Sequence, residues 1–416
     1  MSEWRETEMG TIPSTWKLYT VEQLVENETI DKPLDGNHGE IHPKGSDFVE
    51  TGIPFIMATD INNGKVDLVN CKFITKEQAD SLNKGFSISE DVLLTHKASL
   101  GRTAIVGKIQ SPYIMLTPQV TYYRIKNKNL LNNKYLKYFF DSPAFQDTLV
   151  NHGDSGSTRA YVGITAQREL PVILPSNIEE QKAIASVLSS LDDKIDLLHR
   201  QNKTLEAMAE TLFRQWFVEE AEEDWEEVTI GDFVELNRVS IDKYYPHKTI
   251  EYLDTGSLIE GKIGSFQSFS LYEAPSRAKR LAQHNDILIS TVRPDQKHYG
   301  IIKNPIENLV VSTGFCVLTC TKIDPHFIYL LLTNGEMTDY LHTIAEGSTS
   351  TYPSLKPSDI GAIVFQLPPD DKLKKFAAIA HNSWEKIENN HIQIRILEKL
   401  RDTLLPKLMS GEIRVA

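Results

Sequence analysis

The sequence of 416 residues is poor in cysteine and lacks long apolar runs. Its three cysteines are Cys71, Cys316 and Cys320. So few thiols are typical of proteins in a reducing compartment, and we expect them to be buried and unpaired. No stretch reaches the roughly 18 apolar residues of a membrane span, and the amino terminus lacks a secretion-signal pattern. We therefore expect a cytoplasmic protein with no membrane association.

Signatures of catalysis are missing as well. There is no phosphate-binding loop with its glycines, lysine and hydroxyl in order. Residues 304–307 lack the second proline and the aromatic residue of an amine-methyltransferase turn, and residues 294–297 resemble a nuclease Asp-x-Lys element without an identifiable second carboxylate. The twelve histidines show no metal-ligand spacing. We expect no catalytic residue, metal or cofactor in this chain.

An overall excess of positive charge is also absent. The formal net charge is −13, which taken alone argues mildly against nucleic-acid binding. Seven acidic residues and no basic one fall within residues 219–227, a run typical of a solvated linker or a helix end. Local basic patches, not the total charge, must therefore decide whether the protein binds nucleic acid.

A regular apolar seam is the strongest feature present. Steps of three and four residues separate Leu188, Leu191, Ile195, Leu198, Asn202, Leu205, Ala209, Leu212 and Trp216. Such a narrow stripe is typical of a helix that packs against another helix. The segment Ser176-Asn177-Ile178-Glu179 supplies a helix-capping pattern just before it. The sequence predicts a long helix over residues 176–218.

A second copy of this helix lies near the carboxyl terminus. Residues 374–409 overlay residues 182–217 without a gap, with ten identities. The second seam contains Ile387, Asn390, Ile394, Leu397 and Leu404. An asparagine in such a seam costs stability but fixes the register of the pair. We predict a second helix over 369–410 that pairs antiparallel with the first, although Ala380 and Ser383 make its early seam weak.

The repeat extends beyond the helices. Residues 16–21, 61–66, 90–95, 135–140 and 156–158 return in the same order at 225–230, 258–263, 285–290, 327–332 and 347–349. Strands such as 91–95 and 120–125, and one or two helices such as 134–140, predict α+β units with a curved, mostly antiparallel sheet. The chain is thus predicted to be a tandem duplication with pseudo-two-fold symmetry. Its segments are 1–175, 176–218, 219–368 and 369–410, with a closing tail over 411–416 that reaches the first unit and adds a strand there.

Basic and hydroxyl side chains gather in the loops of both units, which differ between the two copies while the scaffold is repeated. His96 and His298 lie among them. The candidates for DNA contact are Lys97, Arg102, Ser157, Thr158, Arg159, Arg277, Lys279, Arg280, Arg293, Lys297, Ser348 and Thr349. Lysine and arginine neutralise phosphates, arginine can read guanine edges, and hydroxyl and glycine loops can hold phosphate. Each residue alone could be ordinary surface charge; as a matched set they favour DNA.

The sequence resembles a known family along nearly its whole length, twice. The stretches 174–185 and 188–195, the tail Leu404-Leu405-Pro406-Lys407-Leu408-Met409-Ser410-Gly411 and the opening Ile12-Pro13-Ser14-Thr15-Trp16 resemble the specificity subunits of type I restriction–modification systems. Residues 371–374 depart from the family's usual acidic-Gln pair.

The resemblance implies that each globular unit reads one half of a split, asymmetric double-stranded DNA target. It implies that the helix pair sets the gap and docks two modification subunits, which bind S-adenosylmethionine, and that two restriction subunits can add ATP- and Mg²⁺-dependent cleavage. One alternative is a coiled-coil adaptor that does not bind DNA; another is an enzyme with its own nuclease or methyltransferase site.

Overall fold

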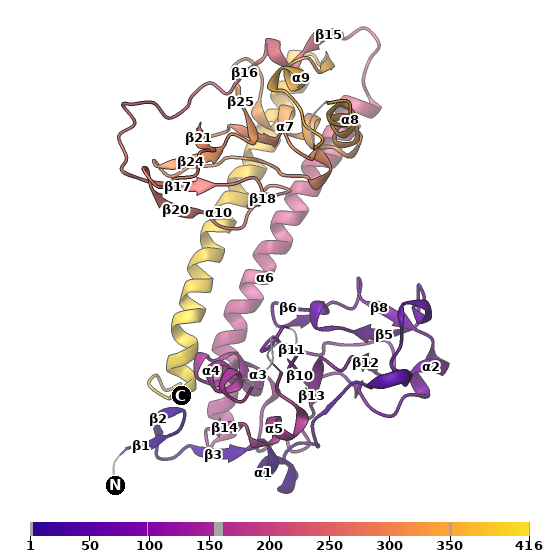
Figure 1. Ribbon diagram of the computed structural model, residues 1–416, viewed down its shortest axis with the longest axis vertical. Helices are drawn as coiled ribbons and strands as arrows, with labels where there is room; N and C mark the ends of the chain where they lie inside the picture. Colours follow the sequence, from indigo (N-terminus) through magenta and orange to yellow (C-terminus); the bar gives the residue numbers. More distant parts are fainter. Residues whose placement is uncertain (1–2, 98, 154–160, 349–351, 416) are drawn as a thin grey trace. The chain divides into compact units, whose positions relative to one another are not determined.

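The protein consists of two units that share one topology (Figure 1). The computed structural model describes residues 3–97, 99–153, 161–348 and 352–415. Unit 1 comprises Met1–Asp196 with Ile394–Ala416, and unit 2 comprises Leu197–Gln393. Two long helices each contribute to both units. Each unit therefore contains one globular domain and one stretch of the helix pair.

Unit 1 contains two four-stranded sheets among its described residues. The antiparallel sheet has the order β11-β10-β13-β4 (Thr103–Ile105, Val92–Thr95, Val120–Tyr123, Leu34–Asp35). The mixed sheet has the order β8-β5-β12-β9 (Lys72–Ile74, Ile53–Ile56, Ile114–Leu116, Phe86–Ser87), in which β5 and β12 run parallel. Three short pairs are β1-β2 (Trp4–Thr7, Gly10–Pro13), β3-β14 (Lys17–Thr20, Pro171–Leu174) and β6-β7 (Ile61–Asn62, Lys65–Val66).

Unit 2 repeats both four-stranded sheets and two of the three short pairs; among its described residues the pair β1-β2 has no counterpart. Its antiparallel sheet is β16-β25-β22-β23 (Val234–Leu236, Phe315–Cys320, Ile287–Ser290, Tyr299–Ile301). Its mixed sheet is β20-β17-β24-β21 (Gln267–Ser270, Thr249–Leu253, Leu309–Ser312, Ala278–Leu281), again with one parallel pair, β17-β24. The short pairs are β15-β26 (Glu226–Thr229, Val364–Leu367) and β18-β19 (Leu258–Ile259, Lys262–Ile263).

The α+β class and the duplication are therefore confirmed, but the single curved sheet expected for each unit is wrong. Alternating apolar strands predict that a sheet exists, whereas its division into two depends on which strands pair over long sequence distances. In unit 1 the side chains of Leu93, Val120, Ile56 and Leu116, which come from both sheets, share one buried cluster. Neither sheet could bury its apolar face alone.

Short helices cover the sheets and carry local start signals. In unit 1 they are α1 (Val21–Glu26), α2 (Lys76–Asp80), α3 (Asn133–Asp141), α4 (Pro143–Asn151) and α5 (Ile164–Glu169). In unit 2 they are α7 (Pro325–Thr333), α8 (Gly335–Glu346) and α9 (Pro357–Gly361). Asn132 and Asp324 cap the equivalent helices α3 and α7, because their side chains accept hydrogen bonds from the first-turn backbone N–H groups.

The two predicted long helices are confirmed. They are α6 (Ile178–Arg214), which continues as a π-turn over Gln215–Glu219, and α10 (Asp370–Met409). Asn177 caps α6 by accepting from the N–H of Glu179 at 3.0 Å, and Gly411 ends α10 with a φ of +76°. The two helices pair antiparallel in unit 2. Asn202 of α6 contacts Asn390 of α10, and Phe213, further along α6, contacts Phe376, which comes earlier in α10.

Each domain is joined to its helices by an apolar core. In unit 1, Tyr135 and Phe139 of α3 share a buried cluster with Leu188 of α6 and Leu408 of α10. In unit 2 the corresponding cluster joins Phe327 of α7 to Phe213 of α6, Phe376 of α10 and Trp384 of α10. Burying side chains of this size contributes about 1.5–3 kcal/mol each, so the helices are integral parts of both units.

The closing tail reaches unit 1 as expected, but it adds no strand. Residues 412–415 form no strand with any of the described residues. Instead Arg414 donates a hydrogen bond to Glu180 on α6, and a Cβ on Gly411 would lie 2.5 Å from the Pro13 ring. The tail is therefore held by side-chain contacts, which the alternation pattern of a strand does not describe.

Candidate nucleic-acid interface

In each unit, backbone hydrogen bonds tie together three loops at the end of one sheet. In unit 1 the N–H of His96 donates to Gln119, and the carbonyl of His96 accepts from Val162, at 2.9 and 3.0 Å. In unit 2 the N–H of Thr291 donates to Gly314, and the carbonyl of Thr291 accepts from Leu355, both at 2.8 Å. The same junction thus forms in both copies, directly after strands β10 and β22.

In unit 1 this junction presents a lysine on a tyrosine ring. Lys97 and Tyr161 form an antiparallel β-bridge, and the Lys97 ammonium lies 5.6 Å from the ring centroid of Tyr161. Lys97 is exposed, and no carboxylate within the described residues forms an ion pair with it. A cation on an aromatic face is held in position by the ring quadrupole while its charge stays available.

Unit 2 presents the same combination with an arginine. The Arg293 guanidinium lies 4.7 Å from the ring centroid of Tyr352, and the Arg293 N–H donates to Pro353 at 3.0 Å. Arg293 has a φ of +49°, a left-handed conformation that costs a β-carbon-bearing residue roughly 1–2 kcal/mol. Tyr352 is 53% exposed. Strain of this kind is often found at binding sites, where the surroundings hold a side chain in one direction.

The two tyrosines occupy equivalent positions, and the sequence analysis missed them. Each stands three residues after the threonine of a Gly-Ser-Thr loop, Thr158 before Tyr161 and Thr349 before Tyr352. The repeat itself carried this signal, because the tyrosine recurs when the flanking residues do not. The basic residues indicate the loops, but they do not indicate the aromatic partner that positions each cation.

His96 is not a candidate for DNA contact, contrary to the expectation from its place in the basic loop. Its side chain is fully buried, its Nδ1 lies 3.0 Å from the Val162 carbonyl oxygen, and its ring lies 5.6 Å from that of Tyr161. Burial lowers the pKa of His96 to about 4, so the imidazole is neutral at pH 7. His96 packs against Tyr161, and its neutral ring offers no positive charge to a phosphate.

The remaining cations differ in how available they are. Lys297 forms an ion pair with Glu260 at 3.1 Å, so its charge is already compensated. The Arg102 guanidinium donates to the side chain of Asn62 at 3.3 Å. Arg277 and Lys279 are exposed. Arg280 is half-buried, burial lowers its pKa, and its Nε has no hydrogen-bond partner in the part of the chain that the structure describes.

The structure brings Arg277 toward the same turn as Arg293. The carbonyl of Arg277 accepts from Thr313, and the adjacent Gly314 accepts from Thr291, two residues before Arg293. The register of β21 against β24 shifts between Ala278 and Arg280, so the strand that carries these cations is bulged. Bulges re-aim side chains at the edges of sheets. Arg277 and Arg293 therefore border one turn, between β24 and β25.

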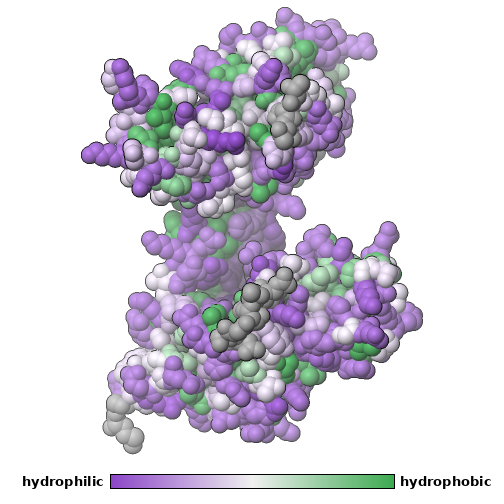
Figure 2. Space-filling model, viewed as in Figure 1, coloured by the Kyte–Doolittle hydropathy of each residue, from purple (hydrophilic) through white to green (hydrophobic). Residues whose placement is uncertain are grey.

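The hydroxyl candidates are mostly outside the described residues. Ser157, Thr158 and Thr349 lie there, as does the basic candidate Arg159. Ser348 is described: it is half-buried and its hydroxyl lies 3.3 Å from that of Ser354. On the face shown in Figure 2, hydrophilic residues cover most of each unit.

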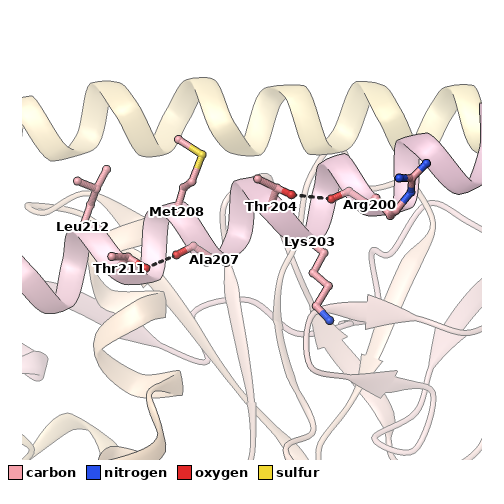
Figure 3. A pocket seen from close by; sticks show the side chains of 7 residues that line it. All are labelled: Arg200, Lys203, Thr204, Ala207, Met208, Thr211 and Leu212. Carbon is pink, nitrogen blue, oxygen red and sulfur yellow. Dashed lines mark hydrogen bonds between the residues drawn. The ribbon is translucent and has the colours of Figure 1, made fainter. Parts of the chain in front are cut away.

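The residues of the two apolar seams are all buried or half-buried. Leu188, Ile195, Leu198, Asn202, Ile387, Asn390 and Ile394 are buried, and Leu191, Leu205, Leu212, Leu397 and Leu404 are half-buried. The Asn390 side chain donates to that of Asn202 at 2.7 Å. On α6 of unit 2 the groove shown in Figure 3 is lined by Arg200, Lys203, Thr204, Ala207, Met208, Thr211 and Leu212.

Two kinds of feature are missing from the described residues. None of the described helices combines the length and apolar character needed to cross a bilayer. The residues that the structure describes also contain no group of three or more His, Cys, Asp or Glu side chains arranged to hold a metal ion.

Comparisons with known proteins agree with this architecture. The family model described as type I restriction modification DNA specificity domain matches residues 13–207 and 222–399. The MjaIX type I restriction enzyme specificity subunit of Methanocaldococcus jannaschii is 27% identical over 444 aligned residues, which cover 100% of this chain and 97% of that protein. The putative MjaX specificity subunit of the same organism is 23% identical, covering 99% and 96%. The solved S subunit of a type I restriction–modification system from M. genitalium matches the fold with a TM-score of 0.60 and 15% identity, covering 94% of this chain and 96% of that one.

Proposed function

This chain belongs to the type I restriction modification DNA specificity family, and we propose that it reads a bipartite, asymmetric double-stranded DNA target for a modification complex. Each unit binds one half of the target. The paired helices set the gap between the halves and dock two modification subunits, to which two restriction subunits can be added. The chain recognises and assembles; S-adenosylmethionine, ATP and Mg²⁺ belong to the partner subunits.

One observation carries the assignment of DNA contact. At the equivalent place in both units, a cation without a carboxylate partner among the described residues rests on a tyrosine ring, and each tyrosine follows a Gly-Ser-Thr stretch in the sequence. Ordinary surface charge would not keep this arrangement through a duplication whose loops otherwise differ. A positioned lysine or arginine can neutralise a phosphate, and an arginine can also reach a base edge. Lys97 thus serves the half read by unit 1, and Arg293 the half read by unit 2.

A split target also makes physical sense for two small domains. Each domain contacts only a few base pairs, and a mismatch costs roughly 1–3 kcal/mol. Linking the two domains multiplies their selectivity without new contacts. The different cations and loops of the two units, lysine against arginine, favour two different half-sequences.

The experiment uses the chain assembled with its modification subunits. Arg293→Ala should weaken DNA binding and lower the steepness of its salt dependence by about one unit of log–log slope, as expected for one lost phosphate contact. It should relax methylation selectivity only in the half read by unit 2, and Lys97→Ala only in the other half.

Lys297→Ala provides the matched control. It removes a cation four residues from Arg293, but one that is already paired with Glu260. This variant should bind DNA as the natural chain does. Equal effects of the Arg293 and Lys297 variants would contradict the assignment, as would relaxed selectivity in both halves from a single change.

The groove on α6 is proposed to dock a modification subunit. Met208 is 54% exposed although it stands on the paired helix, and Arg200 and Lys203 line the same groove. This combination suits an amphipathic helix that brings apolar and acidic side chains. Met208→Asp should abolish co-purification with the modification subunit, whereas Thr204→Asp, at a side chain on the same groove with a smaller apolar surface to lose, should weaken it less. Equal co-purification of the Met208 variant and the natural chain would contradict this docking site.

A further inference from the structure

The seam of the paired helices contains two asparagines at positions that are not equivalent in the repeat. The ungapped overlay of the two helices aligns Asn390 with Leu198, and Asn202 with Ile394. Each helix therefore has its amide where the other helix has an aliphatic side chain. The duplication alone gives no reason for this offset.

Because of the offset, the two amides meet when the first helix pairs with the second helix. In unit 2 the Asn390 Nδ2 donates to the Asn202 Oδ1 at 2.7 Å, with both residues buried. The other amide atoms, Asn202 Nδ2 and Asn390 Oδ1, are buried and have no hydrogen-bond partner among the residues that the structure describes. A pair that leaves two polar atoms unsatisfied is costly, so its benefit must lie elsewhere than in stability.

A second offset pair in unit 1 follows the same logic. Asp192 of α6 accepts a hydrogen bond from Arg401 of α10 at 3.0 Å. The repeat aligns Asp192 with Trp384, and Arg401 with Ala209. At these two aligned positions, α6 has the aspartate but not the arginine, and α10 has the arginine but not the aspartate. This contact therefore also needs one copy of each helix.

We propose that these two offset pairs select the helix partner: α6 is built to pair with α10 and to reject a second copy of α6. The overlay shows what pairing of like helices would do. Asn202 would face Leu198 of the other copy, and Asp192 would face Ala209, so neither would have its partner. Two copies of α10 would likewise place Asn390 opposite Ile394 and Arg401 opposite Trp384.

The selectivity can be given a size. Pairing of like helices leaves four amide atoms unsatisfied where the native pair leaves two. Each additional buried unsatisfied atom lowers the association constant roughly tenfold or more, so the amides alone give about a 100-fold preference for the native pair. An asparagine in an apolar seam is known to fix pairing in this way at the expense of stability. The ion pair, which is half-exposed, adds to it.

The test starts from the folded full chain, which is cut into two halves that are both kept. A protease site inserted between Ala221 and Glu222, in the exposed segment after the π-turn, allows the folded chain to be cut into two fragments. Two differently isotope-labelled batches are cut, mixed, unfolded in urea and refolded, and native mass spectrometry counts the pairs. The natural chain should return one first fragment with one second fragment, with about 1% or less of like pairs, which is the 100-fold preference expressed as a population.

Substitutions then move the preference in defined directions. The double change Asn202→Leu with Asn390→Leu should raise the melting temperature of the uncut chain and increase the proportion of like pairs at least tenfold. Leu198→Asn should enrich pairs of the first fragment, because the amide introduced in one copy then meets Asn202 of the other. Ile195→Asn is the matched control, since it adds an amide that meets no second amide in either pairing.

Three results would overturn the proposal. The natural chain could give the statistical mixture of pairs, the double leucine variant could keep the same partner preference as the natural chain, or Leu198→Asn and Ile195→Asn could enrich like pairs equally. Should an asparagine variant fail to refold, the natural chain and the double leucine variant, whose seam is more apolar, still decide the question.

Discussion

Arg401 of α10 donates a hydrogen bond of 3.0 Å to Asp192 of α6, and this carboxylate is also the acceptor for the α3 hydroxyl of Tyr138 at 2.7 Å. The Lys137 ammonium lies 3.6 Å from the same carboxylate. Asp192 thus joins the recognition domain of unit 1 to both long helices. It lies within the stretch 188–195 that carried the family resemblance, which gives that stretch a structural reason.

Replacing this carboxylate should loosen the attachment of the domain. Asp192→Ala leaves three partly buried donors without their shared acceptor, so we expect a loss of about 1–3 kcal/mol in the free energy of unfolding. Urea unfolding of the full chain measures it. Asp193→Ala removes an exposed carboxylate from the next position and should cost less than about 0.5 kcal/mol, as is usual for surface changes. Equal losses would show that Asp192 is not a connecting residue.

The end of α10 should tolerate no side chain at Gly411. Its φ of +76° disfavours any β-carbon, and that carbon would lie 2.5 Å from Pro13 Cγ. Gly411→Ala should therefore lower the melting temperature by several degrees, since it combines about 1 kcal/mol of backbone strain with a steric clash. Gly10→Ala separates the two effects, because Gly10 also has a positive φ, +102°, with nothing within 4 Å of the added carbon. A smaller loss for Gly411→Ala than for Gly10→Ala would contradict this packing of the carboxyl-terminal tail.

His96 should make unit 1 sensitive to acid. Burial lowers its pKa from 6.5 to about 4, so the folded state binds this proton less readily than the unfolded state. The contribution is fully present above about pH 6.5, falls as the pH is lowered toward 4 and is absent below it, amounting to roughly 3 kcal/mol. Asp35, His38 and Lys97 face the ring and set its field.

Urea unfolding at several pH values tests this account. The natural chain should lose stability between about pH 6.5 and 4 more steeply than His96→Gln, which cannot take up the proton. Parallel pH profiles of the two proteins would contradict it.

The helix pair should act as a spacer for the DNA target. Inserting one heptad into α6 after Asp196 and one into α10 before Ile394 lengthens both helices by about 10 Å, which corresponds to about three base pairs of duplex. The gap between the two halves of the target should grow accordingly, while the half-sequences stay the same. The same seven residues inserted after Ala221 should leave the gap unchanged. A gap that does not respond to the paired insertion would exclude the spacer role.

The sequence predicted the periodic parts of the molecule well. The long helices and their caps could be identified because steps of three and four residues and the residues around Ile178 and Gly411 act locally. The duplication was visible because ten positions are identical in a single ungapped overlay. The offset of Asn202 and Asn390 was also in the sequence, but that the two amides meet depends on which turn of one helix faces which turn of the other.

The loops could be predicted only in part. Basic residues marked these loops as candidates, yet the sequence could not distinguish Lys297, whose charge is paired, from Arg293, whose charge rests on an aromatic ring. Histidine is a residue type that can contact DNA, but His96 is buried like a core residue, because it directly follows strand β10 and lies in the junction of three loops. Such differences depend on contacts between segments far apart in the chain, which composition does not report.

The most direct test is a map of DNA methylation at single-base resolution in cells that make the modification subunit, with and without this chain. The proposed function predicts that one split, asymmetric methylated motif is present with the chain and disappears without it. It further predicts that exchanging residues from about 20 to 170 for those of another family member changes one half of that motif only. An identical methylation pattern with and without the chain would contradict the specificity function, and a change in both halves after the exchange would contradict the division of recognition between the two units.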